Sequence, residues 1–307
     1  MTQALQGQLA LQHLGVIRAE GEDAAVFLQG QLSNDVQLLP VGQARLAAFL
    51  SAKGRMQASF IVIKRSASEF WLLTSRDVLA ATLKRLSMFV LRAKVKMSDA
   101  SEAVQLVGLA GDTVPAEART LAPWQTVQLG DASVVRLFAA SGESRALLAA
   151  PAGSPLPASV AQSPALNAAA WQLSLVQAGV PLITQPVVDA FVPQMVNFES
   201  VDGVSFKKGC YPGQEVVARS QFRGTLKRRM YRVAAPEAVS VGQEVFLASD
   251  AEQPVGTVVQ TAPAAQGGYE ALVSMRIDAS TEALHLGSSS GPGLQLLSLP
   301  YTLKDDI

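Results

Sequence analysis

Apolar positions in the first part of the chain alternate between the spacing of strands and that of helices. Residues 14–20 follow the two-residue period of a strand, and 69–75 predict another strand. The segment 47–65 holds two apolar runs around Lys53-Gly54-Arg55, which predicts a hairpin. A helix is predicted from about Asp23, because the apolar positions after it share one helical face: Ala25, Phe27, Leu28 and Leu32.

Two longer segments, 77–91 and 167–181, carry the three-to-four-residue spacing of amphipathic helices. Residues 93–99 and 104–111 predict further strands, and the proline-rich stretch 150–164 predicts a connector. Strands and helices thus alternate without a strict repeat. The pattern predicts an α+β fold in which helices lie against mixed sheets.

The pattern changes near residue 229, where short apolar runs separated by turns replace the mixture of helices and strands. The predicted C-terminal strands are 229–235, 245–248, 254–262, 268–277 and 293–299. Their spacing is typical of a small all-β barrel or jelly roll. We therefore predict two domains, one over residues 1–228 and one over 229–307.

Composition fits a globular protein without a strong overall field. Of the 307 residues 49% are hydrophobic, and Lys+Arg equals Asp+Glu at 25 each, so electrostatic recognition has to be local. A single cysteine excludes an internal disulfide and fits a reducing compartment. No basic-then-apolar leader and no long apolar run is visible, so we expect a soluble, cytoplasmic protein with no membrane partner.

Several kinds of chemistry gain no support from the sequence. KKGCYPGQE lacks the spacing of a nucleotide-binding P-loop. The only histidines, His13 and His285, are interpreted as ordinary surface or hydrogen-bonded residues. One cysteine and two dispersed histidines are too few for a zinc site or a protein-held iron–sulfur cluster, so no metal site is predicted.

The only cysteine, Cys210, lies in the segment FKKGCYPGQEVVARS, residues 206–220. Pro212 suits the first position of a helix, Glu215 suits its first turn, and Glu215 with Arg219 makes an i,i+4 pair. A helix is therefore predicted to begin here. Cys210 would lie just before its N-terminus, where the helix dipole favours a thiolate.

The charges and the flexible backbone around Cys210 also favour a reactive thiol. Lys207, Lys208 and Arg219 would add positive charge near the thiol, and glycines at 209 and 213 allow tight turns. The segment 207–229 holds seven basic residues and one acidic residue, Glu215, so its local charge is about +6. Its basic residues are Lys207, Lys208, Arg219, Arg223, Lys227, Arg228 and Arg229. A buried structural cysteine within a solvated basic face is the alternative interpretation.

The block FKKGCYPGQEVVAR resembles the signature of the YgfZ family of folate-binding proteins, relatives of the glycine-cleavage T-protein, an aminomethyltransferase. Similar blocks follow in the family's order over nearly the whole chain. They are FLQGQLSNDV (27–36), SAKGRM (51–56), AWQLSLVQAGVPLI (170–183), FVPQMVN (191–197), FRGTLKRR (222–229) and LPYTL (299–303).

The resemblance implies a folate-binding α+β region of two ferredoxin-like subdomains, with the chain crossing between them, followed by a C-terminal β-barrel. It also implies a tetrahydrofolate-dependent role in iron–sulfur cluster assembly or repair. The implied partners are folate and iron–sulfur proteins or assembly factors, with tRNA affected only indirectly through its modification. The functional thiol would be Cys210, within a motif formed by Lys208, Gly209, Tyr211, Gly213, Gln214, Glu215 and Arg219.

The resemblance places the folate near two positions, Trp171 and Leu14, the second of which carries a tryptophan in described family members. The anionic glutamate tail of the folate would suit the basic segment, with Arg223 as a candidate. We expect Trp171 to report folate binding by fluorescence and Trp71 and Trp124 to respond less. Trp171 as an ordinary core aromatic is the alternative.

One departure from the T-protein pattern bears on catalysis. T-protein relatives carry acidic residues in the strand after the glycine that matches Gly54, whereas this chain has Gln57-Ala58-Ser59. Without a carboxylate near the reacting folate nitrogen, aminomethyl transfer is disfavoured. A binding and accessory role is therefore predicted. A folate-dependent one-carbon transferase is the alternative, and a nucleic-acid-binding protein, suggested by the basic segment alone, is the third.

Overall fold

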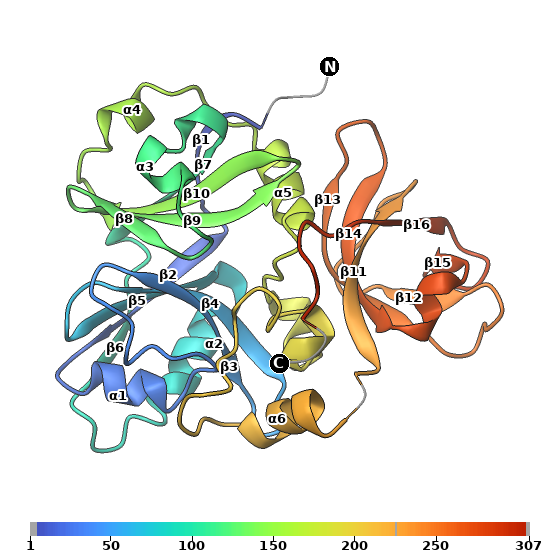
Figure 1. Ribbon diagram of the computed structural model, residues 1–307, viewed down its shortest axis with the longest axis horizontal. Coiled ribbons are helices and arrows are strands. Elements are labelled where there is room, and N and C mark those ends of the chain that lie inside the picture. The colour runs from blue at the N-terminus through green and yellow to red at the C-terminus, as the bar shows by residue number, and fades with distance from the viewer. Residues whose placement is uncertain (1–4, 225, 305–307) are drawn as a thin grey trace.

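The computed structural model describes residues 5–224 and 226–304. Two five-stranded sheets form the N-terminal part, and a closed barrel of six strands forms the C-terminal part (Figure 1). All strand pairs in these sheets and in the barrel are antiparallel. No helix within the described residues has the length and apolar character needed to cross a membrane.

The first sheet has the strand order β3-β4-β5-β2-β6 and carries two helices on its outer face. Its elements are β2 (Leu14–Glu20), α1 (Ala24–Gln29), β3 (Ala44–Leu50), β4 (Met56–Lys64), β5 (Glu69–Ser75), α2 (Arg76–Ser87) and β6 (Lys96–Asp99). Phe27 and Leu28 of α1 and Leu79 and Leu86 of α2 pack on this face. The apolar stripe of each helix is thereby buried against alternate residues of the strands.

The second sheet has the order β1-β7-β10-β9-β8 and carries short helices on its own outer face. Its elements are β1 (Gly7–Ala10), β7 (Val104–Ala110), α3 (Ala116–Arg119), β8 (Thr126–Leu129), β9 (Ala132–Ala140), β10 (Glu143–Pro151) and α4 (Ala158–Ala161). The N-terminal strand β1 pairs with β7, so the chain begins in the second sheet before it forms the first. This crossing ties the two sheets together.

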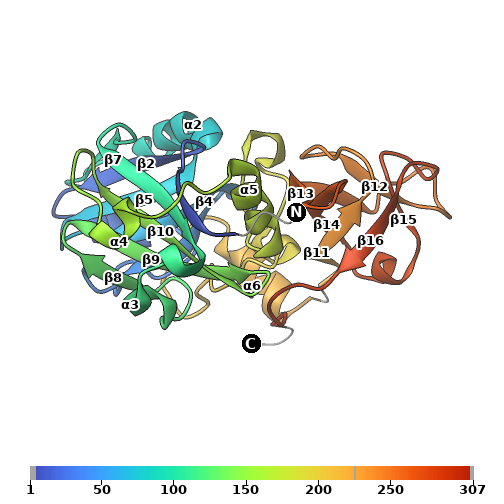
Figure 2. The same cartoon turned by 90° about the horizontal axis from the view of Figure 1, so that it is seen from above.

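The inner faces of the two sheets meet in one continuous core that also contains helix α5 (Ala168–Gln177). The Asn167 side chain caps α5 by accepting hydrogen bonds from the amides of Ala169 and Ala170. Trp171 of α5 lies against Gly108 of β7, where an added Cβ would come within 2.8 Å of the indole ring. Figure 2 shows α5 between the sheets and the barrel. The helix thus connects all three layers.

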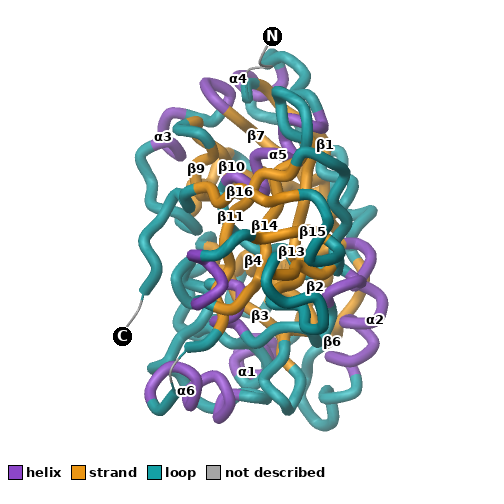
Figure 3. Tube along the Cα trace, turned by 90° about the vertical axis from the view of Figure 1, so that its right-hand side faces the viewer, coloured by secondary structure: helices purple, strands orange, loops and turns teal. Residues whose placement is uncertain are grey.

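The barrel closes in the order β11-β14-β13-β12-β15-β16 and faces the viewer in Figure 3. Its strands are β11 (Arg228–Ala235), β12 (Glu244–Leu247), β13 (Gly256–Pro263), β14 (Tyr269–Arg276), β15 (Leu284–Leu286) and β16 (Gly293–Leu297). The 3-10 helices of the chain span Gly111–Thr113, Gln185–Val187, Pro193–Val196 and Asp278–Thr281. Met230, Val259 and Leu272 of the barrel belong to the same core as α5. The barrel is therefore packed onto the N-terminal part.

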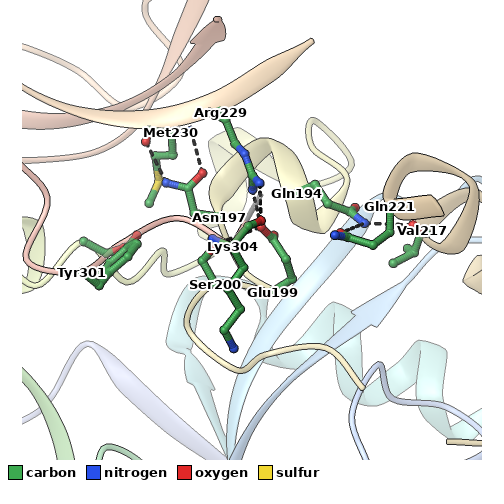
Figure 4. A network of polar contacts seen from close by, with 11 residues as sticks. Gln194, Asn197, Glu199, Ser200, Val217, Gln221, Arg229, Met230, Tyr301 and Lys304 are labelled. Atoms are coloured by element: carbon green, nitrogen blue, oxygen red, sulfur yellow. Dashed lines mark hydrogen bonds and ion pairs between the residues drawn. The ribbon is translucent and has the colours of Figure 1, made fainter. Parts of the chain in front are cut away.

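The segment 194–200 makes a buried polar junction between the barrel, helix α6 (Gln214–Phe222) and the N-terminal part (Figure 4). The Gln194 amide donates to the Val217 carbonyl of α6 at 2.8 Å. Asn197 exchanges two hydrogen bonds with the backbone of Met230 in β11. Because a buried polar group without a partner is costly, these bonds fix the three parts relative to one another.

A buried ion pair completes this junction. Arg229 of β11 donates to Glu199, and neither side chain is more than 3% exposed. The second nitrogen of the guanidinium, Nη2, donates to the Lys304 carbonyl near the end of the described chain. Arg229 is therefore a structural residue, and the expectation that it belongs to an exposed basic surface is wrong.

The predicted α+β class with a C-terminal β-barrel is confirmed. The helix predicted over 77–91 ends at Ser87, because Met88 and Leu91 continue the apolar pattern but point into solvent, where no sheet covers them. The elements not expected from the sequence are the strands β1, β8, β9, β10 and β15 and the short helices α3 and α4. Helix α4 lies within the stretch 150–164, for which the sequence predicts a connector. The division into two independently folding units at 228/229 stays a prediction.

We predict that breaking the buried pair destabilises the protein strongly. Arg229→Met leaves the Glu199 charge buried without a partner and should lower the free energy of unfolding by about 3–5 kcal/mol, measured by urea denaturation. Adding Glu199→Gln should restore part of that loss. The matched control Lys227→Met, at an exposed position of the same segment, should change it by about 0.5 kcal/mol or less. Equal effects of the two single variants would contradict a structural role for Arg229.

Candidate functional site

The loop that carries Cys210 leads into helix α6, as the sequence predicts. The residue before the first helical position is Gly213, and Pro212 lies one residue further back. The helix begins at Gln214, and Gly213 before it adopts a left-handed backbone conformation with φ of 77°. Pro212 therefore precedes the helix and does not occupy its first turn. Glu215 and Arg219 form the expected i,i+4 ion pair at 2.8 Å.

Gly213 is required by a close approach to the hairpin between β3 and β4. A Cβ on Gly213 would lie 2.5 Å from the Ser51 carbonyl oxygen and 2.6 Å from Cα of Gly54. Gly54 also has a positive φ, 73°, and a Cβ there would collide with Val216 of α6. Gly209, in contrast, has open space around it. The motifs SAKGRM and KGCYPGQE thus interlock backbone against backbone.

Lys208 points into the protein and anchors this loop. Its ammonium group donates to the carbonyl oxygens of Gln29 at 2.5 Å and Leu32 at 2.6 Å, at the C-terminal end of α1. It also lies 4.6 Å from the centroid of the Tyr211 ring. Burial lowers the pKa of Lys208 to about 8, although the nearby Asp35 carboxylate opposes that shift. Lys208 is therefore a positioning residue and not a freely exposed cation.

Cys210 itself is exposed, and so are several side chains around it. The expected basic surface is reduced, because Lys208 and Arg229 are buried. Its exposed members are Lys207, Arg219, Arg223 and Lys227. Within the described ranges, no group of three or more His, Cys, Asp or Glu side chains could hold a metal ion.

A pocket lies between the inner faces of the two N-terminal sheets and α5. The space between its lining atoms is about 660 Å³, with the open solvent at its mouth included. Its walls are mostly apolar and aromatic. The aromatic lining residues are Phe60, Trp124, Phe138 and Trp171.

Leu14 and Trp171, the two positions suggested for folate, both line this pocket. The structure therefore brings them together from β2 and α5. Trp124, expected to respond less to folate than Trp171, lines the same pocket and donates its indole N–H to the Val201 carbonyl at 2.8 Å. Arg223 is exposed at the end of α6 and does not line the pocket.

The polar groups of the pocket are few. The Arg145 guanidinium is buried, and His13, exposed on one side, is enclosed enough at the pocket rim for burial to lower its pKa. On the strand where T-protein relatives carry acids, Gln57 pairs with Asp189, and Ser59 accepts a hydrogen bond from the Ile183 amide. No carboxylate lines the pocket in the described part of the chain.

Sequence reasoning missed Arg145, Trp124 and the position of His13. A signal for Arg145 was present, because it shares one strand face with Leu147 and Ala149, both buried. An isolated arginine on an otherwise apolar strand face predicts a buried charge, which marks a candidate functional residue. His285, interpreted as an ordinary histidine, hydrogen-bonds to the Gly291 carbonyl and is satisfied there.

A wide groove lies on the other side of Trp124. It spans about 1850 Å³, open solvent included, between the edges of the sheets and the segment before Cys210. Arg45, Lys207 and Lys304 supply its cations. Trp124 is common to the pocket and the groove, so a ligand in one is close to the other.

We predict that Lys208 makes stability depend on pH. Its pKa is about 8 in the folded protein against 10.5 when unfolded, so the cost of burying its charge is present below pH 8 and disappears as pH rises to 10.5. The free energy of unfolding of the wild type should therefore rise relative to Lys208→Met across that range, by on the order of 2 kcal/mol. Lys207→Met, exposed next to it, should follow the wild type. A constant difference between wild type and Lys208→Met would refute this anchoring.

Comparison with known proteins agrees with the resemblance in the motifs. A model of the GCVT N-terminal domain matches residues 3–136. A "tRNA-modifying protein YgfZ" of Klebsiella pneumoniae (strain 342) is 31% identical over 301 residues, covering 93% of this chain and 90% of that protein. One of Serratia proteamaculans (strain 568) is 28% identical, covering 97% and 93%.

The fold also matches a solved structure. The glycine cleavage system aminomethyltransferase T from Bartonella henselae superimposes with a TM-score of 0.74 at 18% identity, covering 98% of this chain and 87% of that one. At this identity the match concerns the fold alone. The relatives at about 30% identity extend over nearly the whole chain, both sheets and the barrel included. The chain belongs to the YgfZ family.

Proposed function

We propose that this protein is a tetrahydrofolate-binding accessory factor that supports iron–sulfur cluster assembly or repair and, through it, tRNA modification. The observation that carries the proposal is the aromatic pocket between the two N-terminal sheets, where Leu14 and Trp171 meet. A pterin is planar and suits apolar and aromatic walls with a few orienting polar groups. Relatives named "tRNA-modifying protein" support the tRNA part.

The residues of the pocket fit a reduced folate in binding but not in one-carbon transfer. Arg145 can donate hydrogen bonds and His13 can donate or accept them, whereas no lining carboxylate in the described residues could take a proton from a reacting nitrogen. Bound tetrahydrofolate would supply one-carbon chemistry if a donor were present. The chain itself supplies binding and orientation, and therefore the accessory role is favoured over the aminomethyltransferase.

Cys210 is proposed as the reactive thiol of this role. Lys208 anchors its loop to the end of α1, and the pair Gly54 and Gly213 fixes the loop against the hairpin. The thiol is held at the surface by buried contacts on both sides. Such an exposed thiol on a rigid loop is suited to reaction with a partner protein.

The folate proposal is tested by titrating the purified protein with tetrahydrofolate while tryptophan fluorescence is recorded. We expect saturable quenching, because Trp124 and Trp171 line the pocket. Trp171→Phe and Trp124→Phe should each reduce the quenching, whereas Trp71→Phe is the control, since Trp71 lies outside the pocket lining under Arg65. Absence of saturable binding would refute the proposal, and net turnover with a one-carbon donor would favour the transferase.

The thiol is tested with Cys210→Ser. Because the side chain is exposed, the variant should keep the wild-type melting temperature and the affinity for tetrahydrofolate. It should fail to restore iron–sulfur enzyme activity and tRNA thiolation in cells that lack the native gene. The wild type should also react with iodoacetamide at one site while folded. Full restoration by Cys210→Ser would exclude a chemical role for the thiol.

A further inference from the structure

Arg145 is a buried cation on the inner face of β10. Only 2% of its surface is exposed, and the strand positions that follow on the same face are Leu147 and Ala149. Burying a charged group costs several kcal/mol unless it is paired and hydrogen-bonded. A buried arginine at this position therefore needs hydrogen-bond acceptors or an opposite charge.

The protein provides hydrogen-bond acceptors for only part of this guanidinium. Nη1 donates to the Phe138 carbonyl at 3.3 Å, and the guanidinium carbon lies 4.7 Å from the centroid of the Trp171 ring. Nε and Nη2 have no hydrogen-bond partner. Among the described residues no carboxylate forms an ion pair with Arg145, and burial together with the positive charge of Arg136 lowers its pKa to about 9.

The two free donors have a defined geometry. Nε–H and one N–H of Nη2 point the same way along one edge of the planar guanidinium, so they form a fork that binds two adjacent acceptor atoms. The indole nitrogen of Trp171, which lines the same pocket, also lacks a partner. Buried unpaired donors gathered in one pocket indicate a ligand that carries acceptors.

We propose that Arg145 is the ligand-recognising residue of the pocket and that its Nε–Nη2 edge binds two adjacent acceptor atoms of the folate. This inference rests on the function proposed above and adds the residue that recognises the ligand. Two parts of a reduced folate offer such a pair. They are the O4 oxygen with the N5 lone pair of the pterin, and a carboxylate of the glutamate tail.

The test compares Arg145→Met and Arg145→Lys with the wild type by calorimetric titration with tetrahydrofolate. Loss of charge-assisted hydrogen bonds should weaken binding by roughly 10- to 100-fold in Arg145→Met. Lysine keeps the charge but not the fork, so Arg145→Lys should recover little of that affinity. Arg92→Met, at an exposed position outside the pocket lining, is the charge-matched control and should bind nearly as the wild type does.

A thermal melt of the ligand-free proteins separates recognition from a structural role. If Arg145 serves the ligand, replacing its half-paired buried charge by methionine should leave the melting temperature unchanged or raise it. A lower melting temperature with unchanged affinity would show that Arg145 only supports the core. Equal affinity of Arg145→Met and wild type overturns the inference and leaves the proposed function intact. A wild type that does not bind tetrahydrofolate overturns both.

Two fragments identify which end of the folate the fork reads. 6-Methyltetrahydropterin carries the pterin acceptors without the tail, and p-aminobenzoylglutamate carries the carboxylates without the pterin. If the fork reads the pterin, Arg145→Met weakens binding of the first fragment by the same factor as binding of tetrahydrofolate. If it reads the tail, the loss appears with the second. Loss with neither fragment, beside an unchanged affinity for tetrahydrofolate, overturns the inference.

Discussion

Glu199 and Arg229 lose their hydration together when the barrel packs onto the N-terminal sheets, and much of the molecule's arrangement follows from their pairing. A buried charge tolerates no displacement of its partner, so β11 is held at one place relative to the segment 194–200. The same segment holds α6 through Gln194. The barrel and the loop that carries Cys210 therefore share one rigid support.

The two candidate functional centres, the loop that carries Cys210 and the aromatic pocket, differ in polarity and exposure. The thiol loop is polar and exposed, but buried contacts of Lys208 and Gly213 fix it. The pocket is apolar and enclosed, yet it contains the incompletely paired charge of Arg145. Trp124 lines both the pocket and the groove that reaches Lys207. The pocket and the surface beside Lys207 therefore share one aromatic wall.

Local signals made part of this structure predictable. The hairpin around Gly54, the helices α1, α2 and α5 and five of the six barrel strands follow from periodicity and turn residues. The helix after Cys210 follows from Pro212, the acidic first turn and the Glu215–Arg219 pair. The inward direction of Lys208 and the pairing of Arg229 with Glu199 depend on segments far away in sequence. Charge counting over a short window treats such residues as surface, which is why the basic segment was overestimated.

The close approach of Gly54 and Gly213 has a consequence for how the protein is made. The loop that carries Cys210 can pack in this way only against the formed hairpin, because the Gly213 backbone lies directly against the Ser51 carbonyl and the Gly54 Cα. Bringing such distant parts of a chain together costs loop-closure entropy, so this contact is slow to form. During synthesis the hairpin leaves the ribosome long before the loop does, so Cys210 reaches its final position only in a nearly complete molecule. A half-made chain thus does not display the thiol in its functional setting.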